Sequence, residues 1–263
     1  MEIIEKKESY TSLESALSGV QDFSMHFIVL FNRALTVGER SICDLVIFGK
    51  TVKEWVKSCS GGRGRITEIE YSNENAVIEL ISPYLGNETY TIVLYADTPL
   101  LRFPSIMSLV EEMNVRGQNV KKLKRGYIFN TKFIKSTTSI YAPEQSTEFD
   151  DEFFTVRDNQ TFMIATNVIK QRIFAYHISN GVIILSEATT TIDAEAEIES
   201  GVIIHQNNAV LGHSYIKRGT ILYPNNVIKD SYIGCRCLLK GGYIENAKVV
   251  DETIIEPFSK IVL

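Results

Sequence analysis

The chain lacks the features that mark membrane, secreted and nucleic-acid-binding proteins. Its longest apolar run near the N-terminus, Phe27 to Phe31, is far shorter than the roughly 20 residues that a membrane helix needs. Glu2, Glu5 and Glu8 interrupt the pattern of a signal peptide. The formal net charge is −5 and the basic residues are not clustered, which argues against a nucleic-acid partner. We therefore expect a cytoplasmic protein with neither a membrane nor a nucleic-acid partner.

Cysteine is also scarce. The 263 residues include four cysteines, and none of their spacings is typical of a metal site. Cys235 and Cys237 form the only close pair, so we expect reduced structural thiols. The chain is 44% hydrophobic and 22% charged, which is ordinary for a globular protein, and it is long enough for two domains.

A six-residue repeat of aliphatic residues fills the C-terminal part of the chain. The expected inward positions are Ile192, Ile198, Ile204, Val210, Ile216, Leu222 and Ile228, followed after a slip of one residue by Ile233, Leu239, Ile244, Val250, Ile255 and Ile261. This period fits neither a helix nor an alternating strand, but it fits a chain that winds round a three-sided prism. Glycine and asparagine stand where its turns are expected: Gly201, Gly212, Gly219, Gly234, Asn207-Asn208 and Asn225-Asn226. Residues 182–263 are therefore predicted to form a left-handed parallel β-helix of about four coils, with an irregular β-sandwich as the alternative.

The N-terminal part alternates buried strands with amphipathic helices. After an irregular arm with a short helix at Tyr10–Ser18, strands are expected at 25–31, 65–70, 90–95 and 126–129, and helices at 51–59, 77–84 and 104–114. This order predicts an open, mostly parallel α/β sheet. The predicted division is an α/β domain at 1–153, a connecting helix at 154–181 and the β-helix at 182–263.

Asp97 is the principal candidate for a functional residue in the α/β part. It follows the buried strand 90–95 directly, and the carboxyl edge of such a sheet is where ligands bind. The alternative is that Asp97 caps the helix that follows. The acidic run Asp150–Glu152 is interpreted as a solvated surface and not as a metal site.

Several motifs resemble those of the bifunctional N-acetylglucosamine-1-phosphate uridyltransferase/glucosamine-1-phosphate acetyltransferase family. Leu94–Leu101 is similar to the family's Leu-Tyr-Gly-Asp-Val-Pro-Leu-Ile, and Gly49–Val56 looks like its Gly-Lys-Pro-Met helix start. Asn207–His213 resembles Gly-Asn-Val-Thr-Leu-Gly-His, Val227–Gly234 resembles Val-Ile-Lys-Asn-Ser-Val-Ile-Gly, and Ile255–Ser259 resembles Ile-Gly-Pro-Phe-Ala. The resemblance implies a shortened Rossmann-like nucleotidyltransferase domain, a connecting helix and a left-handed β-helix.

The resemblance also implies a reaction and a site. In the family, a sugar-1-phosphate attacks the α-phosphorus of UTP, with Mg²⁺ as cofactor. Asp97 matches the Mg²⁺-binding aspartate. The family's second ligand, an asparagine, falls on Arg157, and a shift in the alignment brings Asp158 or Asn159 to that position. The further candidates for binding a uridine nucleotide or a sugar phosphate are Tyr95, Arg33, Arg40 and Lys50.

The departures from the family pattern weaken the expectation of catalysis. The Gly-rich phosphate loop becomes Leu30–Arg40, which keeps one glycine and carries Glu39. The base-binding segment falls on Ser72–Val77 without its glycines, and the sugar-binding Asn-Thr-Gly becomes Lys124-Arg125-Gly126. Acetyl transfer uses later coils than those before Leu263, so we expect none. A divergent enzyme, an impaired relative that binds a sugar nucleotide or partner protein, and a scaffold all remain open.

Assembly is predicted from the prism. A short prism leaves flat faces, and a homotrimer would cover them. Tyr215, Tyr223 and Tyr232 are candidate interface residues, because aromatic residues are enriched at interfaces. The alternative is a monomer.

Overall fold

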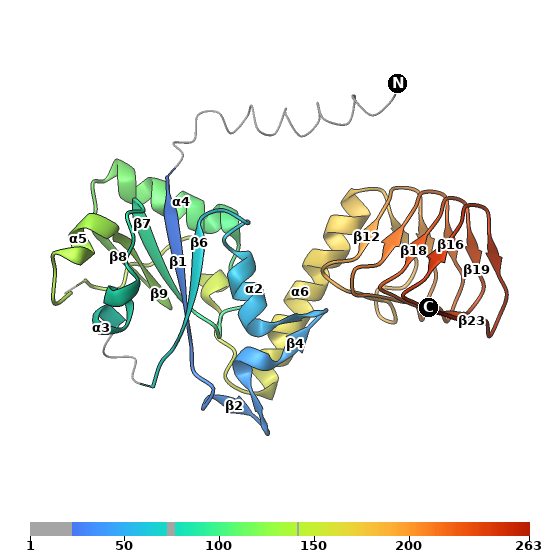
Figure 1. Ribbon diagram of the computed structural model, residues 1–263, viewed down its shortest axis with the longest axis horizontal. Helices are drawn as coiled ribbons and strands as arrows, with labels where there is room; N and C mark the ends of the chain where they lie inside the picture. Colours follow the sequence, from blue (N-terminus) through green and yellow to red (C-terminus); the bar gives the residue numbers. More distant parts are fainter. Residues whose placement is uncertain (1–22, 73–76, 141) are drawn as a thin grey trace.

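The computed structural model describes residues 23–72, 77–140 and 142–263, so the helix expected at Tyr10–Ser18 lies outside the described residues. Figure 1 shows a sheet covered by helices (the α/β half, residues 23–153), the long helix α6, and a prism of short strands (the β-helix, strands β10 to β23). No described helix is both long and apolar enough to cross a membrane.

The sheet of the α/β half has five strands in the order β6-β1-β7-β9-β8. They are β1 (Met25–Phe31), β6 (Arg65–Glu70), β7 (Tyr90–Tyr95), β8 (Val120–Leu123) and β9 (Gly126–Asn130). Strand β1 runs parallel to β6 and β7, whereas β9 is antiparallel to both β7 and β8. The prediction of a mostly parallel sheet therefore holds for β6, β1, β7 and β8, which run in the same direction, whereas β9 runs against them and makes the sheet mixed. The two residues between β8 and β9 can join only antiparallel strands.

Helices cover both faces of this sheet. They are α2 (Val52–Ser58), α3 (Val77–Ile81), α4 (Phe103–Val115) and α5 (Thr131–Lys135). Alternate residues of β1 point to opposite faces: Phe27 and Val29 lie in one core with residues of α2 and α4, and Ile28 and Leu30 lie in the other with residues of α3 and α5. All seven residues of β1 are buried, as the continuous apolar run predicted.

Short elements complete the α/β half. They are β2 (Thr36–Val37), β3 (Arg40–Ser41), β4 (Val46–Ile47), β5 (Lys50–Thr51) and the 3₁₀ helices at Ile42–Asp44, Ser82–Tyr84 and Asp150–Phe153. β2 pairs with β3 and β4 with β5, both antiparallel. The helix expected at 77–84 is therefore an α-helix followed by a 3₁₀ turn that contains Pro83.

Helix α6 (Asn159–Ser179) begins five residues later than the expected start at Phe154. Asp158 sets this start, because its side chain accepts a hydrogen bond from the Thr161 N–H at 2.8 Å in a capping box. Ile169 packs into a core with Ile42, Ile47 and Val52 of the α/β half. Near its other end, Phe174 packs into the core of the β-helix. Helix α6 therefore contacts both parts.

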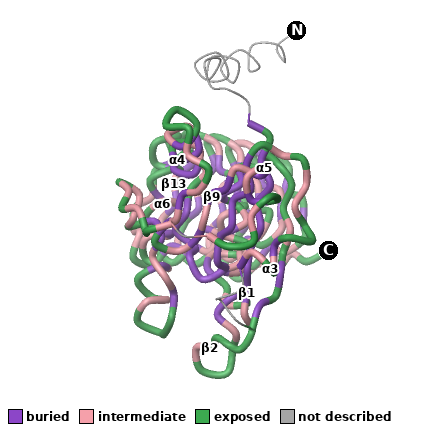
Figure 2. The backbone as a smooth tube through the Cα atoms, turned by 90° about the vertical axis from the view of Figure 1, so that its left-hand side faces the viewer, coloured by how far each residue is buried: buried purple, intermediate pink, exposed green. Residues whose placement is uncertain are grey.

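The C-terminal strands form the left-handed parallel β-helix that the repeat predicted. Three parallel sheets stack five, five and four strands, which makes four complete coils and part of a fifth. The strands are β10 (Ile183–Ile184), β11 (Thr191–Ile192), β12 (Glu197–Ile198), β13 (Ile203–Ile204), β14 (Ala209–Leu211), β15 (Tyr215–Ile216), β16 (Ile221–Leu222), β17 (Val227–Lys229), β18 (Tyr232–Ile233), β19 (Leu238–Leu239), β20 (Tyr243–Glu245), β21 (Lys248–Val249), β22 (Ile254–Ile255) and β23 (Lys260–Val262). Ile204, Val210, Ile216, Leu222 and Ile228 are all 0% exposed. Figure 2, seen from the α/β half, shows buried residues inside the molecule and exposed ones in its outer loops.

One predicted inward position is wrong. Val250 is 66% exposed, and its neighbour Val249 is buried in its place. The corner between β20 and β21 has only two residues, Asn246 and Ala247, whereas the equivalent corner between β14 and β15 has three. Asn246 accommodates the tighter corner with a positive φ of 52°. The six-residue step from Ile244 therefore runs one residue too far, whereas the next predicted position, Ile255, is buried.

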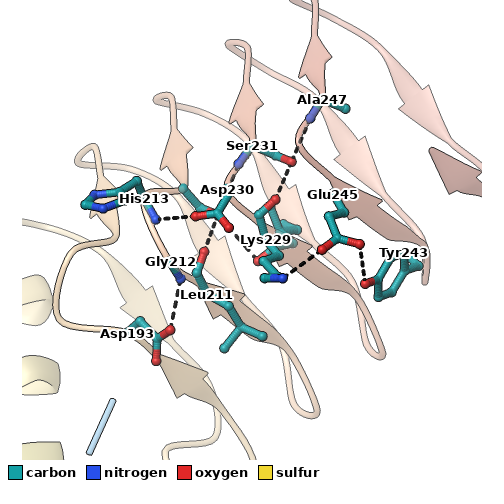
Figure 3. A network of polar contacts seen from close by, with 12 residues as sticks. Asp193, Leu211, Gly212, His213, Lys229, Asp230, Ser231, Tyr243, Glu245 and Ala247 are labelled. Atoms are coloured by element: carbon teal, nitrogen blue, oxygen red, sulfur yellow. Dashed lines mark hydrogen bonds and ion pairs between the residues drawn. The ribbon is translucent and has the colours of Figure 1, made fainter. Parts of the chain in front are cut away.

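The corners are held by hydrogen bonds between coils (Figure 3). Asp193 accepts a hydrogen bond from the Gly212 N–H at 2.9 Å, and one coil further on Asp230 accepts from the His213 N–H at 3.0 Å. Gly212 has a φ of 60°, and a Cβ there would overlap the Asp230 carboxylate. Glycine is required at this corner for both reasons, as the sequence predicted.

A second column of hydrogen bonds lies inside the β-helix. Asn208 and Asn226 are 1% and 0% exposed, and the Asn226 Nδ2 donates to Asn208 Oδ1 at 2.9 Å. Asn226 Oδ1 also accepts from the N–H groups of Gly241 and Gly242, both at 2.9 Å. Since a buried polar group is costly without a partner, these asparagines are stable in the interior only as a connected column.

Candidate functional site

Asp97 lies at the carboxyl edge of the sheet, two residues after β7 ends at Tyr95. The Ala96 N–H donates to the Leu30 carbonyl at 2.8 Å, which keeps this segment beside the end of β1. Asp97 lines a small cavity together with Asn32 and Leu35, the first residues of the loop that replaces the phosphate loop. The cavity measures about 10 Å³, about the space of a single water molecule.

The carboxylate of Asp97 is held by Arg125. The Arg125 Nη2 lies 2.7 Å from Oδ2 and its Nε lies 3.2 Å from Oδ1, so both carboxylate oxygens accept a hydrogen bond. Asp97 is only 6% exposed. A two-point contact of this kind is the strongest form of ion pair between an arginine and a carboxylate. Arg125 therefore neutralises the one acidic side chain on which the expected metal site depends.

Two tyrosines fix the position of Arg125. Its guanidinium lies 3.9 Å from the ring centroid of Tyr95, and its Nη2 lies 3.4 Å from the Tyr71 hydroxyl. The rings of Tyr71 and Tyr95 meet edge to face at 5.6 Å. The stacking follows from strand register: Leu94 pairs with Gly126 in the antiparallel β7–β9 ladder, so Tyr95 and Arg125 are the next residues along the two strands. A cation over an aromatic ring adds a stabilising interaction to the ion pair.

The alternative in which Asp97 caps the following helix is not what the structure shows. The residue at the N-cap of α4 is Arg102, and the carboxylate of Asp97 is bound to Arg125 instead. The backbone of Asp97 has another role, because its carbonyl accepts a hydrogen bond from the Val156 N–H at 2.8 Å. This contact brings the segment before α6 to the edge of the sheet.

The structure does not bring the other basic candidates to Asp97. Arg33 lies over the ring of Phe31 at 5.6 Å, and Arg40 is exposed in the β2–β3 hairpin. Lys50 lies 3.6 Å from Glu195 of the β-helix and 5.6 Å from the ring of Trp55. Lys50 therefore belongs to the junction with the β-helix.

The candidates for a second metal ligand have structural roles. The Asp158 carboxylate accepts from the N–H and the hydroxyl of Thr161, both at 2.8 Å, and the backbone hydrogen bond lowers the pKa of Asp158. Asn159 is the first residue of α6. Within the described part of the chain, no group of three or more histidine, cysteine or acidic side chains could hold a metal ion.

The residues at this edge do not fit a magnesium ion. Mg²⁺ binds oxygen atoms of carboxylates, phosphates and water. Both oxygens of Asp97 accept from Arg125, and Asp158 is directed at its own helix. A cation at Asp97 would have to displace the guanidinium first.

The acidic run before α6 is only in part the solvated surface that the sequence suggested, because Asp151 is exposed but Glu152 is buried. Glu152 is 6% exposed and accepts hydrogen bonds from the side chain of Arg102 and from its backbone N–H, the latter at 3.1 Å. Arg102 stands 50 residues earlier in the chain, so no local pattern reveals this pairing.

Sequence reasoning did not identify Arg125 as the partner of Asp97. The available signal was the replacement of the family's sugar-binding Asn-Thr-Gly by Lys124-Arg125-Gly126. Gly126 is the part of this motif that is kept, and its φ is 143°. A Cβ on Gly126 would lie 2.5 Å from the Val93 carbonyl oxygen, so a larger residue would disturb the β7–β9 pairing.

The α/β half with an acidic residue at its sheet edge, the long helix and the left-handed β-helix together form the architecture that the motifs implied, a shortened Rossmann-like domain joined by a helix to a β-helix. The chain is similar in sequence to proteins named bifunctional protein GlmU. That of Clostridium acetobutylicum is 38% identical over 94 residues, or 36% of this chain and 21% of the relative. That of Clostridium novyi is 32% identical over 111 residues, or 42% and 24%. That of Bacillus velezensis is 28% identical over 217 residues, or 80% and 45%.

These matches confirm the resemblance that the motifs indicated. They cover less than half of each relative's own length. No protein-family model matches the chain. Among solved structures, CMP:2-keto-3-deoxy-manno-octonic acid synthetase complexed with CTP aligns with a TM-score of 0.40 and 9% identity, over 57% of this chain and 99% of that chain.

Proposed function

We propose that this chain is a non-catalytic relative of the nucleotidyltransferases that functions as an assembly protein. The observation that carries the proposal is the ion pair between Arg125 and Asp97. It puts a fixed, singly charged cation where the resemblance implies a divalent metal ion. Mg²⁺ then has no place in the function, and metal-dependent transfer of a uridylyl group is not expected.

The energy of the ion pair supports the loss of metal binding. Removing one partner of a buried ion pair costs about 3–5 kcal/mol, because the other charge is left uncompensated. A metal ion that displaced Arg125 would bear a cost of this kind. Since about 1.4 kcal/mol corresponds to a factor of ten in affinity, binding would be weakened roughly a hundredfold or more.

The loop after β1 supports the same conclusion for the nucleotide phosphates. A phosphate loop binds because its backbone N–H groups point at the anion. Here the Ala34 N–H donates to Asn32 Oδ1 at 2.9 Å, and the Leu35 N–H donates to the Asn32 carbonyl at 3.3 Å. The Ile42 N–H donates to the Leu35 carbonyl at 2.9 Å. The loop thus uses these donors within itself.

The β-helix supplies a surface for assembly. The sheet β10-β13-β16-β19-β22 carries an outward column of five aliphatic residues in register: Ile183, Ile203, Ile221, Leu238 and Ile254. Ile183 and Ile254 are 50% and 51% exposed. The outward column of the sheet β11-β14-β17-β20-β23 includes Lys260. That of the sheet β12-β15-β18-β21 includes Glu197 and Lys248. The apolar column is the surface through which three copies of the chain would form a homotrimer.

The three tyrosines expected at the interface lie on two faces. Tyr223 follows β16, on the face with the aliphatic column, and stacks on His205 at 5.3 Å. Tyr215 and Tyr232 stack on each other at 5.6 Å on the face that carries Lys248. Tyr223 is therefore the aromatic residue that fits the proposed interface best. A cytoplasmic location belongs to the same proposal.

The test is an assay of pyrophosphate release from UTP and N-acetylglucosamine-1-phosphate with Mg²⁺. The GlmU protein of Clostridium acetobutylicum serves as the positive control. We expect no release above background, and no Mg²⁺-dependent rise in melting temperature with UTP or UDP-N-acetylglucosamine at millimolar concentration. Pyrophosphate release that requires Mg²⁺ would refute the non-catalytic function. A metal-independent shift with a uridine nucleotide would point instead to sugar-nucleotide binding.

A further inference from the structure

A groove lies where the α/β half, helix α6 and the first coil of the β-helix meet, and its lining does not include Asp97. Its volume is about 450 Å³, within the range of small-molecule sites. The lining of the groove is largely apolar. It includes Trp55 of α2, Leu101 just before α4, Phe103 at the start of α4, and Ile169 and Ile173 of α6. The groove is thus large enough for a small apolar body.

The charged groups in the groove leave a net positive charge. Lys50, Arg102 and Arg172 line it. Lys50 is paired with Glu195 at 3.6 Å, and Arg102 is paired with the buried Glu152. Arg172 donates to the Leu100 carbonyl at 2.7 Å, and no carboxylate of the described residues lies within ion-pair distance of it. Arg172 is half-buried. Burial and then the nearby Arg102 lower its pKa, and the charge of Glu152 offsets part of this. An anion beside Arg172 would stabilise the charged guanidinium against both burial and the repulsion from Arg102.

His177 adds an independent observation. It lines the same groove, is 3% exposed, and its Nδ1 is buried without a hydrogen-bond partner among the described residues. Burial lowers the pKa of His177, so the imidazole is neutral and can donate through one nitrogen and accept through the other. A buried polar atom without a partner is rare in proteins. A ligand in the groove would supply one after a turn of the His177 ring, because Nδ1 is not accessible to solvent in this structure.

We propose that this groove binds a small amphipathic monoanion, with an aliphatic or aromatic body against Trp55 and Ile173 and a single carboxylate that accepts hydrogen bonds from Arg172 and His177. A second groove adjoins the first, because Tyr176 lines both. The second groove is lined by Glu195, Glu197 and Glu199, whose negative charges would repel a polyphosphate more than a monoanion. This inference is independent of the proposed assembly function.

Trp55 allows a direct test, because it is the only tryptophan of the chain and lines the groove. The probe is sodium octanoate, titrated into the full chain while tryptophan emission is recorded, with 1-octanol as the neutral analogue of the same chain length. We expect a saturable change in emission with octanoate. Arg172→Met should weaken octanoate binding about tenfold or more, as expected for the loss of a hydrogen bond to a charged group. It should leave the response to octanol unchanged.

Two further variants make the result decisive. Arg218→Met removes an exposed arginine of the β-helix and should bind octanoate like the wild type. Ser58→Phe fills the groove from α2 and should abolish the response even if Arg172→Met does not fold. A wild type without a saturable response would overturn the proposal. So would an equal loss of affinity in Arg172→Met and Arg218→Met, or octanoate binding that Ser58→Phe leaves intact.

Discussion

Arg125 holds both carboxylate oxygens of Asp97 while its guanidinium lies 3.9 Å from the ring centroid of Tyr95. Tyr95 ends β7, Asp97 follows two residues later, and Arg125 stands in the two-residue turn between β8 and β9, so the pair lies directly at the end of the sheet. A pair that is this well oriented stabilises the native fold and at the same time removes a metal ligand. Its contribution to stability can be measured.

The first prediction concerns this ion pair. Asp97→Asn should lower the free energy of unfolding of the α/β half by about 3 kcal/mol, because the partly buried Arg125 loses its counter-charge. Asp97→Asn/Arg125→Met should recover part of this loss, since removing both charges leaves none uncompensated. Denaturant unfolding of the two single variants and the double variant gives the coupling energy. If Asp97→Asn unfolds like the wild type, the ion pair has no role in stability.

The second prediction tests the inward column of the β-helix. Ile216→Asp should destabilise the β-helix by more than about 4 kcal/mol, since the side chain is 0% exposed and a buried carboxylate there has no partner. Val250→Asp is the matched control, because Val250 is 66% exposed and the cost should stay within about 0.5 kcal/mol. Far-UV circular dichroism during thermal unfolding checks both. Wild-type-like melting of Ile216→Asp would contradict the inward orientation of Ile216.

The third prediction is a pH dependence from His26. Burial, together with the neighbouring Arg65, lowers the pKa of His26 to about 4 from the ordinary 6.5. The Arg65 Nη2 donates to His26 Nδ1 at 3.0 Å, and the Nε2–H therefore donates to Thr67 Oγ1 at 2.8 Å. The neutral ring is favoured in the folded protein, so its stabilisation is complete above pH 6.5 and is lost as the pH falls to about 4. The loss is on the order of 3 kcal/mol.

Denaturant unfolding at a series of pH values between 6.5 and 4.5 measures this loss. His26→Gln removes the titrating group and should flatten the slope of stability against pH in this interval. His213→Gln is the control, because the side chain of His213 is 77% exposed. An unchanged slope in His26→Gln would assign the pH dependence to other groups.

The fourth prediction concerns assembly. Light scattering should give a mass near three times 29.7 kDa, or about 89 kDa, for the wild type. Ile221→Lys places a charge in the middle of the aliphatic column and should shift the mass to that of one chain. Val227→Lys makes the same change on a neighbouring face and should leave the trimer intact. A mass near 30 kDa for the wild type at micromolar concentration would reject the homotrimer.

The sequence alone determined the local elements and the β-helix. The bounds expected for the strands at 25–31, 65–70 and 90–95 are those of β1, β6 and β7, because continuous or alternating apolar residues record how a strand is buried. The six-residue repeat predicted the β-helix for the same reason: every inward residue packs on its equivalent in the next coil. The repeat failed at Val250, where a shorter corner shifted the count.

The tertiary structure decided the chemistry of the site. The sequence placed Asp97 at the sheet edge, but its partner Arg125 stands 28 residues away and reaches it only through the antiparallel pairing of β7 with β9. Likewise, Arg172 and His177 of α6 meet Trp55 in one groove only because α6 packs across the end of the α/β half. Hydrophobic periodicity depends on neighbours along the chain, whereas ion pairs and grooves depend on which strands and helices become neighbours in space.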